Sequence, residues 1–306
     1  MLTEKKRLAA IDIGSNAIRM VIAEYSPQGL RPLKKYRIPI RLGADVFEKG
    51  KISGKNLKEA ARAFRKFREV SNRFGVTRIR AVGTSAMRES KNRAAFVELI
   101  RRKSGIKIEV IDGVEEARLI HQAVAKEIHL EGHRALLIDI GGGSVELTFS
   151  DAGLMSSTQS FPFGTVRTLN LLKKKNLTES QLGLVIGEFI APLSNFIHAQ
   201  SESSPLEFAI GTGGNLEALG RLKDQILKKT SKGDLSYSEL GLIIERLRAM
   251  SVKDRIEKLE LRPDRADVIV PAAMVVQAVM RQSNLEKILI PHVGLKDGIL
   301  WSMIKR

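Results

Sequence analysis

Two aspartates in this sequence, Asp12 and Asp139, stand near the ends of short apolar segments, and each precedes a turn of glycine and small polar residues. The first turn contains Gly14, Ser15 and Asn16, and the second contains Gly141, Gly142, Gly143 and Ser144. Glycine lets the backbone approach a ligand closely, and consecutive N–H groups in such turns bind anions. Mg²⁺ is commonly held by one or two carboxylates plus phosphate oxygens. The two segments therefore indicate phosphate binding beside a divalent cation.

Two further features agree with this interpretation. Glu146 lies two residues after Ser144 and is a further candidate metal ligand. Farther along the chain, an apolar segment leads into Gly211, Thr212, Gly213 and Gly214, and a helix is predicted to begin near Asn215. A glycine-rich turn that opens a helix is a typical phosphate site, because its N–H groups point at the ligand. Neither a Walker sequence nor a dinucleotide-binding fingerprint occurs.

The motifs repeat at a matched separation. Asp12 precedes Gly83 by 71 positions, and Asp139 precedes Gly211 by 72. The segment at 10–14 resembles 137–141, and Gly83-Thr84-Ser85 resembles Gly211-Thr212-Gly213. Matched motifs at a matched separation indicate a duplicated unit. We therefore expect two domains, 1–128 and 129–306, with the boundary in the polar stretch 126–134.

The elements that position these residues follow from the apolar pattern. Residues 8–13 and 18–25 predict a β-hairpin closed by a tight turn, with a third strand within 30–40. Further strands are expected at 78–83 and 108–111, and helices at 92–103 and 113–129. The order then restarts with strands at 135–140, 145–150 and 208–210. The expected class is α/β.

One predicted helix, at 56–74, is amphipathic. Apolar residues recur on one of its faces at helical spacing. Its other face carries Lys58, Arg62, Arg65, Lys66 and Arg73. We interpret this basic face as solvated surface rather than as a binding groove.

Composition narrows the function classes. The 306 residues carry a net charge of +17, which favours an anionic ligand. There is no cysteine, which excludes disulfides, thiolate metal sites and cysteine nucleophiles. The five histidines show no metal-ligand spacing. Aromatic residues make up 5%, which disfavours a protein that stacks nucleic-acid bases, so no specific nucleic-acid partner is expected.

The sequence suggests neither a secretory signal nor a membrane anchor. Asp12 interrupts the first apolar run too early for a signal peptide. No apolar stretch approaches the length that spans a bilayer. We therefore expect a cytoplasmic protein without a membrane partner.

Taken together, the motifs resemble the exopolyphosphatase/guanosine pentaphosphate phosphohydrolase (Ppx/GppA) family, in its short two-domain form. The resemblance spans nearly the whole chain and is specific as a combination. It rests on seven segments, at 10–19, 83–92, 112–120, 139–147, 163–167, 211–214 and 262–267.

The resemblance implies a fold and a set of roles. The fold would consist of two ribonuclease H-like domains of the actin-like ATPase superfamily (the acetate kinase/Hsc70/actin type), with an interdomain cleft. Glu116 would activate or orient water, and Asp139 and Glu146, with Asp12 as a further candidate, would hold Mg²⁺ or another divalent cation. The phosphates would be lined by Gly14, Ser15, Asn16, Arg88, Gly141, Gly142, Gly143, Ser144, Gly213 and Gly214. A homodimer is expected only by family analogy.

Three details qualify the match. Glu115 and Glu116 are adjacent on a predicted helix and point in different directions, so one of them is central, and the place of Glu116 before Ala117 and Arg118 favours it. Asn215 stands where the family has Thr, although Asn still caps helices well. The long family members also carry C-terminal helical domains beyond the length of this chain.

The leading expectation is exopolyphosphatase activity, the Mg²⁺-dependent release of terminal orthophosphate from inorganic polyphosphate. Hydrolysis of guanosine pentaphosphate (pppGpp), a nucleotide of the stringent response, is the alternative within the same fold. A catalytically silent phosphate or nucleotide sensor, an ATP-dependent kinase or chaperone and a nucleic-acid binder are the remaining alternatives.

Overall fold

The computed structural model describes residues 5–201, 205–229 and 233–304. The chain folds into two compact units. Unit 1 contains residues 1–123 and returns at the end of the chain with residues 295–306, whereas unit 2 contains residues 124–294. The α/β class and the division into two units are therefore confirmed.

Unit 1 contains a five-stranded mixed sheet in the order β3-β2-β1-β4-β5. Its strands are β1 (Lys6–Ile13), β2 (Ile18–Ser26), β3 (Gly29–Ile38), β4 (Arg78–Gly83) and β5 (Ile108–Val110). The first three strands are antiparallel neighbours, and β4 and β5 continue the sheet parallel to β1.

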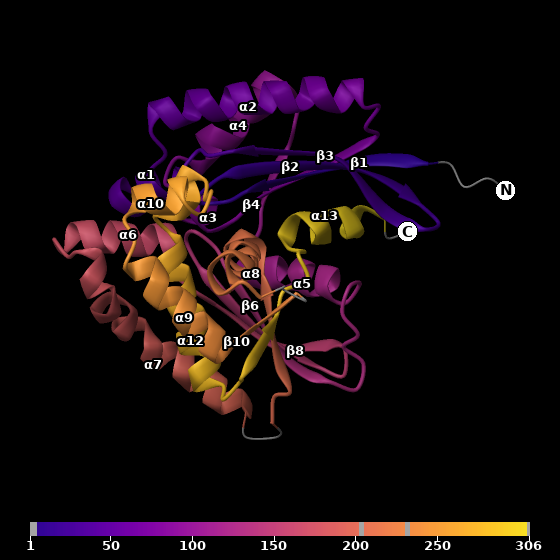
Figure 1. Ribbon diagram of the computed structural model, residues 1–306. Coiled ribbons are helices and arrows are strands. Elements are labelled where there is room, and N and C mark those ends of the chain that lie inside the picture. Colours follow the sequence, from indigo (N-terminus) through magenta and orange to yellow (C-terminus); the bar gives the residue numbers. More distant parts are fainter. Residues whose placement is uncertain (1–4, 202–204, 230–232, 305–306) are drawn as a thin grey trace. The chain divides into compact units, whose positions relative to one another are not determined.

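Six helices accompany this sheet: α1 (Leu42–Lys49), α2 (Gly54–Arg73), α3 (Ser85–Glu89), α4 (Arg93–Ser104), α5 (Gly113–Val124) and α13 (Leu295–Ile304). Within the unit, α2 and α4 lie on one side of the sheet and α13 lies on the other (Figure 1). The alternation along β1 matches these two sides, since successive strand residues face opposite ways. Ala9, Ile11 and Ile13 join the core beneath α2, and the buried Leu8, Ala10 and Asp12 face the side of α13.

Unit 2 repeats this sheet and adds one strand, in the order β10-β11-β9-β6-β7-β8. Its strands are β6 (Arg134–Ile140), β7 (Val145–Asp151), β8 (Leu154–Phe161), β9 (Phe208–Thr212), β10 (Asp234–Ser236) and β11 (Lys287–Leu289). Strands β6, β7 and β8 are antiparallel, β9 is parallel to β6, and β11 is parallel to β9.

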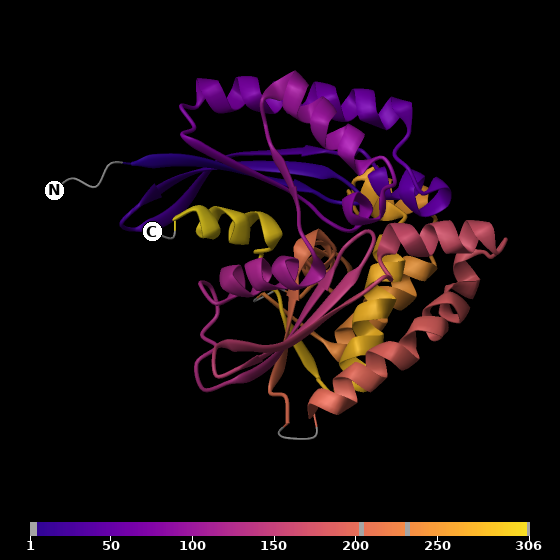
Figure 2. The same cartoon turned by 180° about the vertical axis from the view of Figure 1, so that it is seen from behind.

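The helices of unit 2 bury one face of this sheet. They are α6 (Thr165–Lys174), α7 (Leu182–Ser201), α8 (Gly213–Leu227), α9 (Tyr237–Arg248), α10 (Val252–Glu257), α11 (Pro263–Ala266) and α12 (Ile269–Gln282), with a 3₁₀ turn at Glu179–Gln181. Leu136, Ile138 and Ile140 of β6 join this core, and Asp139 alternates to the opposite face. Figure 2 shows that helices α7 and α12 lie side by side in this unit.

One segment of the described residues, Glu179–Gln200, is long and apolar enough to cross a membrane by length and composition, and 28% of its apolar 18-residue stretch is buried. No such stretch was expected from the sequence. Leu182, Val185 and Leu193 on this helix pack into the core of unit 2. A single apolar helix with a core-facing side is weak evidence for a membrane span.

The duplicated motifs occupy equivalent positions, with one difference in register. Asp12 and Asp139 each lie one residue before the end of the first strand of their sheet. Asp12 is opposite Val82 on the parallel neighbour strand, whereas Asp139 is opposite Thr212. Thr84 and Thr212 both precede a helix, as the repeat predicts. Counted from the residue opposite the aspartate on the neighbouring strand, the helix of unit 2 begins two residues earlier than that of unit 1, which brings Thr212 beside Asp139.

The observed boundaries differ from those expected in one important respect. The sequence analysis assigned all residues after 128 to the second domain, whereas α13 packs on β1, β2 and β4 of unit 1. Gly298 makes this packing close, because a Cβ there would lie 2.0 Å from the Leu119 carbonyl oxygen of α5. Such a return of the chain has no local sequence signal.

Candidate active site

The first glycine turn is supported by helix α1, which the sequence analysis did not anticipate. The Gly14 amide donates to the Ala17 carbonyl oxygen at 3.2 Å, which closes the turn. The Gly43 amide donates to the Ser15 carbonyl oxygen at 2.8 Å. A Cβ on Gly43 would lie 2.8 Å from the Ser15 Cβ, so only glycine permits this approach.

The Ser15 hydroxyl is a buried donor inside this turn. Ser15 is 2% exposed, and its Oγ has no hydrogen-bond partner within the described ranges of the chain. Buried hydroxyls normally have a partner, because a lost hydrogen bond is costly. The hydroxyl is thus suited to donate to an anionic oxygen bound at the turn.

Asp12, a predicted metal ligand, carries a cationic partner. Arg19 lies opposite it on β2, and the Arg19 Nη1 donates to the Asp12 Oδ2 at 3.2 Å. Burial raises the pKa of Asp12, although Arg19 and Lys296 both act to lower it. Neither Arg19 nor Lys296 was expected from the sequence as a site residue.

The predicted water-activating residue, Glu116, forms an ion pair with Arg88. Glu116 lies in the first turn of α5 and is 6% exposed. The Arg88 Nη1 donates to the Glu116 Oε2 at 2.8 Å and to the Ile111 carbonyl oxygen at 3.0 Å. The structure therefore brings together two residues that the sequence analysis assigned separately, one to catalysis and the other to phosphate binding. A charge-assisted pair of this length fixes the direction of the carboxylate.

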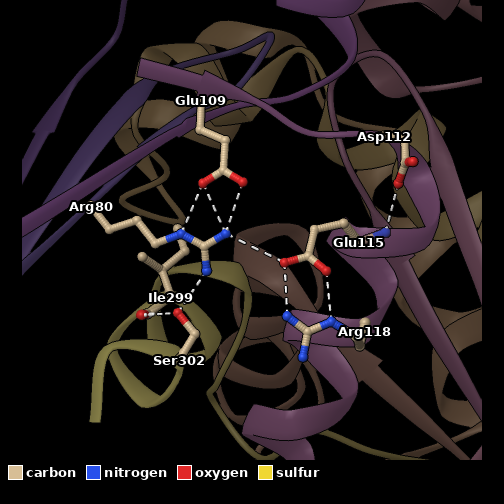
Figure 3. Close-up of polar contacts among 7 residues, drawn as sticks. All are labelled: Arg80, Glu109, Asp112, Glu115, Arg118, Ile299 and Ser302. Carbon is tan, nitrogen blue, oxygen red and sulfur yellow. Dashed lines mark hydrogen bonds and ion pairs between the residues drawn. The ribbon is translucent and has the colours of Figure 1, made fainter. Parts of the chain in front are cut away.

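Glu115 is held in a separate network, which Figure 3 shows. It accepts two hydrogen bonds from Arg118, at 2.6 and 2.8 Å, and one from Arg80 at 3.4 Å. The hydrogen bond from Arg118 is the largest cause that lowers the pKa of Glu115. A carboxylate that is already paired with two guanidinium groups is a poor candidate for orienting water. The geometry thus favours Glu116 over Glu115.

Arg80 lies on β4 and forms hydrogen bonds to residues of β5, α13 and α5. It donates to Glu109 of β5 at 3.0 and 3.1 Å and to the Ser302 hydroxyl of α13 at 2.7 Å (Figure 3). Asp112 caps α5 by accepting from the Glu115 amide at 2.8 Å. Because Glu116 follows directly, this network fixes the backbone that carries it.

The second glycine turn repeats the geometry of the first. The Gly141 amide donates to the Ser144 carbonyl oxygen at 3.0 Å, which matches the pair Gly14 and Ala17. Helix α6 takes the place of α1, since the Val166 amide donates to the Gly142 carbonyl oxygen at 2.8 Å. The Gly142 and Gly143 amides have no hydrogen-bond acceptor in the described part of the chain. Amides in this situation form an anion nest.

Gly164, the residue just before α6, lies directly against the second glycine turn. A Cβ on Gly164 would lie 2.3 Å from the Gly143 nitrogen and 2.4 Å from the Gly142 carbonyl carbon. The Arg167 Nε adds a hydrogen bond to the Gly143 carbonyl oxygen at 2.9 Å. Hydrogen bonds from α6 to the carbonyl groups of Gly142 and Gly143 therefore hold the turn in place.

Two carboxylates face each other beside this turn. Asp139 of β6 lies directly opposite Glu146 of β7. The Thr212 hydroxyl donates to the Asp139 Oδ1 at 2.6 Å, and the Ser160 hydroxyl donates to the Glu146 Oε1 at 2.8 Å. Glu146 is 2% exposed, and such burial of a charged group calls for strong compensation.

The donor set of this pair fits a magnesium ion. No group of three or more His, Cys, Asp or Glu side chains that could hold a metal occurs among the residues the structure describes. Mg²⁺ does not need such a group, since it is usually bound by one or two carboxylates with waters and substrate phosphates. Hydroxyls that orient the ligating carboxylates, as Thr212 and Ser160 would, are typical second partners of such sites.

The Gly213-Gly214 turn lies next to Asp139. Gly213 has a φ of +80°, and a Cβ there would lie 2.8 Å from the Asp139 Oδ1. Both the backbone conformation and the close carboxylate require glycine at this position. The structure thus places the predicted residue Gly213 beside the predicted residue Asp139.

Asn215, which departs from the family pattern, acts here as a buried connector. Its Nδ2 donates to the Ile140 carbonyl oxygen at 2.9 Å, and its Oδ1 accepts from Arg265. Asn215 and Arg265 are each 3% exposed. The amide therefore links the start of the second glycine turn to the motif at 262–267. Ser160 and Arg19 were not expected from the sequence, and Thr212 was expected only as part of the turn at 211–214. Arg19 and Glu146 each follow their aspartate by seven residues, which is the signal that could have identified Arg19.

Known proteins are similar to this chain over nearly its whole length. The family model of the Ppx/GppA phosphatase family matches residues 21–306. An exopolyphosphatase 1 of Mycobacterium leprae is 25% identical over 299 residues, which cover 96% of this chain and 88% of the relative. A guanosine-5'-triphosphate,3'-diphosphate pyrophosphatase of Aliivibrio fischeri is 27% identical over 304 residues. The chain spans 59% of the length of that relative.

Solved structures show the same fold. The exopolyphosphatase from Cytophaga hutchinsonii superposes with a TM-score of 0.87 at 26% identity, and the match covers 97% of each chain. The Aquifex aeolicus member of the Ppx/GppA family gives a TM-score of 0.80 at 24% identity over 98% of each chain. Likeness of this extent covers both units.

Proposed function

Because this chain belongs to the Ppx/GppA phosphatase family, we propose that it is an exopolyphosphatase, which releases terminal orthophosphate from inorganic polyphosphate by hydrolysis of a phosphoanhydride. The observation that carries the proposal is the ion pair at 2.8 Å between the buried Glu116 and the half-buried Arg88 in a chain of this family. The match to a relative named exopolyphosphatase over 88% of that relative's length supports the choice of substrate.

Glu116 is the proposed orienting group for the attacking water. A carboxylate with a fixed direction can accept a hydrogen bond from water and align it with a phosphorus atom. Arg88 fixes that direction and offers positive charge to the oxygens of the phosphate under attack. In phosphoryl transfer, positioning and charge stabilisation supply most of the catalysis.

Asp139 and Glu146 are the proposed ligands of the divalent cation, with Asp12 as a further candidate. When bound, Mg²⁺ would neutralise charge on the phosphate oxygens. Thr212 and Ser160 hold one oxygen of each carboxylate and thereby orient the other. Asp12 differs from Asp139, because Arg19 already supplies a positive charge at 3.2 Å.

The glycine turns are the proposed phosphate contacts. The Gly142 and Gly143 amides and the Ser15 hydroxyl are donors without partners in the described residues, and phosphate oxygens accept from such donors. The contacts proposed from the sequence are Gly14, Ser15, Asn16, Gly141, Gly142, Gly143, Ser144, Gly213 and Gly214.

Guanosine pentaphosphate is the second candidate substrate. It is favoured by the relatives named guanosine-5'-triphosphate,3'-diphosphate pyrophosphatase, at 27% identity. The chain covers only 59% of those relatives, so a large part of them has no counterpart in the match. Inorganic polyphosphate therefore remains the first candidate.

A substrate panel tests the proposal. Purified protein is incubated with long polyphosphate, tripolyphosphate, guanosine pentaphosphate or ATP, each with and without Mg²⁺, and orthophosphate is measured. We expect the highest kcat/KM with polyphosphate and a strong dependence on Mg²⁺. Release from guanosine pentaphosphate alone would replace the first candidate by the second. Absence of release from all four would support a silent sensor and refute both activities.

A variant pair tests the assignment of the orienting group. Glu116→Gln keeps the shape of the side chain and removes its charge, and we expect kcat to fall by roughly 10²–10⁴-fold. Glu115→Gln is the matched control on the same helical turn and should retain much more activity. Equal activity of Glu116→Gln and the native protein would refute the role of Glu116.

A further inference from the structure

The charge of this protein is divided unequally between its two units. Unit 1 contains 31 Lys and Arg against 14 Asp and Glu, whereas unit 2 contains 20 of each kind. The whole net charge of +17 therefore belongs to unit 1. A general drift of composition towards basic residues would have affected both units, so the asymmetry calls for a local cause.

Part of this charge forms a row along helix α2. Lys55, Lys58, Arg62 and Arg65 follow one another at intervals of three, four and three residues, and all four are exposed. Side chains at this spacing lie on the same face of a helix. At a rise of 1.5 Å per residue, the row extends over roughly 15 Å. Glu59 is the only acidic residue of α2 between Lys55 and Arg65.

The row continues towards Arg88 through the junction at the start of α2. The Lys91 amide donates to the Gly50 carbonyl oxygen at 2.9 Å, and the Lys91 side chain covers Gly50, where a Cβ would lie 3.3 Å from its Cε. The Asn92 side chain exchanges two hydrogen bonds of 2.9 Å with the Ile52 backbone. The segment that follows α3 is therefore attached to the segment that precedes α2.

The cations at this junction have exposed heads. Lys49 and Lys51 flank Gly50, and Lys91 lies beside it. Arg93 donates to the Arg88 carbonyl oxygen at 3.1 Å and so lies next to the proposed site. We define the basic strip as Lys91, Lys49, Lys51, Lys55, Lys58, Arg62 and Arg65.

These charges are not consumed by ion pairs. Within the described residues, no side chain of the basic strip forms an ion pair or a side-chain hydrogen bond. Two nearby acids are engaged elsewhere, since Asp45 accepts from Asn56 at 2.7 Å and Glu89 accepts from Ser85 at 3.0 Å. Seven exposed cations that form no ion pair repel one another, which costs stability.

The start of α2 also opposes the preference of helices. Acidic side chains stabilise the first turn of a helix through the macrodipole, and α2 has none there. It carries Lys55 in this turn instead. The arrangement disfavours stability and favours capture of an anion.

We propose that the basic strip binds the internal phosphates of a polyphosphate chain whose terminal phosphate is at Arg88 and Glu116. The inference rests on the proposed function and names how a long substrate is held. It also revises the interpretation of the α2 face as solvated surface. A long chain would contact more of the strip than tripolyphosphate does, so the strip would make affinity depend on chain length.

Polyphosphate fits this strip better than nucleic acid does. Binding of single-stranded nucleic acid relies on exposed aromatic side chains that stack on bases. No aromatic side chain is exposed among the described residues of unit 1. A row of point charges without stacking partners suits a chain that consists of phosphates alone.

The test compares two triple charge reversals in the full chain. Lys51→Glu, Lys55→Glu and Lys58→Glu together alter the strip. Lys174→Glu, Arg246→Glu and Arg281→Glu together are the control, because these exposed residues of unit 2 give the same change of net charge. Glutamate at Lys55 should stabilise the first turn of α2, so unfolding would not explain a loss of binding.

Affinity for end-labelled long polyphosphate is measured at equilibrium without divalent cation, and kcat/KM for tripolyphosphate is measured with Mg²⁺. We expect the strip variant to lose at least about tenfold in affinity, and its plot of log affinity against log salt to be shallower by about 2, at about 0.7 per lost contact. Its kcat/KM for tripolyphosphate should stay within about twofold of the native value, because none of the three altered residues is among the proposed contacts of the terminal phosphate. The control variant should behave like the native protein in both measurements.

Each outcome decides one question. Native affinity in the strip variant, or an equal loss in the control variant, would overturn the strip, even if the native protein hydrolyses polyphosphate. Strip-dependent binding in a protein that hydrolyses no polyphosphate would overturn the proposed function and leave the strip in place. Strip-dependent binding of DNA with no binding of polyphosphate would overturn the assignment of the ligand.

Discussion

Asp139 and Glu146 lie directly opposite each other on β6 and β7, at the positions where unit 1 has Asp12 and Arg19. The same two positions of the duplicated sheet therefore hold a carboxylate pair in one unit and an ion pair in the other. A pair of carboxylates repels unless a cation or a proton lies nearby. The two units thus share this strand geometry and differ in the charge of one residue of the pair. A bound cation would therefore stabilise the pair of unit 2 more than the pair of unit 1.

The first prediction concerns this carboxylate pair. Glu146→Gln removes one of the two charges, and we expect the dissociation constant of Mg²⁺ to rise by roughly 10–100-fold, with a parallel loss of activity at limiting Mg²⁺. Calorimetric titration of Mg²⁺ measures the first effect without turnover. Asp151→Asn is the matched control, because Asp151 is exposed at the end of the same strand. Equal Mg²⁺ affinity in both variants would remove Glu146 from the cation site.

The second prediction concerns the loss of folding stability that results from burying the charged Asp12 carboxylate. Burial raises the pKa of Asp12 above its ordinary 3.8, so the folded protein retains the proton to higher pH than the unfolded chain does. The contribution of Asp12 to stability therefore falls as pH rises from 3.8 through the raised pKa, and the loss is complete above it. Asp12→Asn removes this cost.

The Asp12→Asn variant should have a higher melting temperature than the native protein at neutral pH and a lower kcat. The difference in melting temperature should shrink as pH falls towards the ordinary pKa of the carboxyl group. Thermal unfolding of both proteins across this pH range provides the measurement. A variant that melts below the native protein at neutral pH would show that the partners Arg19 and Lys296 outweigh burial.

The main strands could be predicted because their signals are local. Strand β4 has the bounds expected from its apolar run, and the hairpin of β1 and β2 closes around Asp12 as its sequence indicates. Helices α1 and α6 were missed, although their first turns hold the two glycine turns in place. Each is short, so hydrophobic periodicity gives little signal over its length.

Long-range features were not accessible from the sequence for a different reason. The packing of α13 on β1 depends on how the chain returns after residue 294. The pairing of Glu146 with Asp139 depends on strand register, which is set by the turn and the packed face together. The ion pair of Arg88 with Glu116 could not be predicted, because it depends on where the backbone of Ile111 lies. The Ile111 carbonyl oxygen accepts a hydrogen bond from the same guanidinium group.

The third prediction concerns the close contact behind the second glycine turn. Gly164→Ala would place a Cβ 2.3 Å from the Gly143 nitrogen, so the turn must shift. We expect a loss of stability of about 1–3 kcal/mol and weaker phosphate binding, since the amides of the turn would be displaced. Gly187→Ala is the control, because no atom lies near a Cβ there and alanine favours the exposed helix.

Denaturant unfolding measures the stability of both alanine variants, and inhibition by orthophosphate measures binding. The Gly187→Ala variant should be as stable as the native protein or slightly more stable. Native phosphate binding in a destabilised Gly164→Ala variant would show that the turn contributes to folding but not to the phosphate site.

The last prediction concerns Arg80, which touches no residue of the proposed site directly and acts through Glu115 on the start of α5. Arg80→Met removes the hydrogen bonds to Glu109, Glu115 and Ser302. Because Glu116 is the next residue of the helix, a looser first turn misaligns its carboxylate while leaving the phosphate contacts intact. We expect kcat to fall by about tenfold, which corresponds to about 1.4 kcal/mol, with KM nearly unchanged.

Arg101→Met is the control, because it removes an exposed pair with Glu98 on α4 and should change neither constant. Hydrogen exchange of the amides at 113–117 distinguishes this local effect from general destabilisation. Faster exchange there, combined with native kcat, would show that Arg80 stabilises the helix without positioning Glu116.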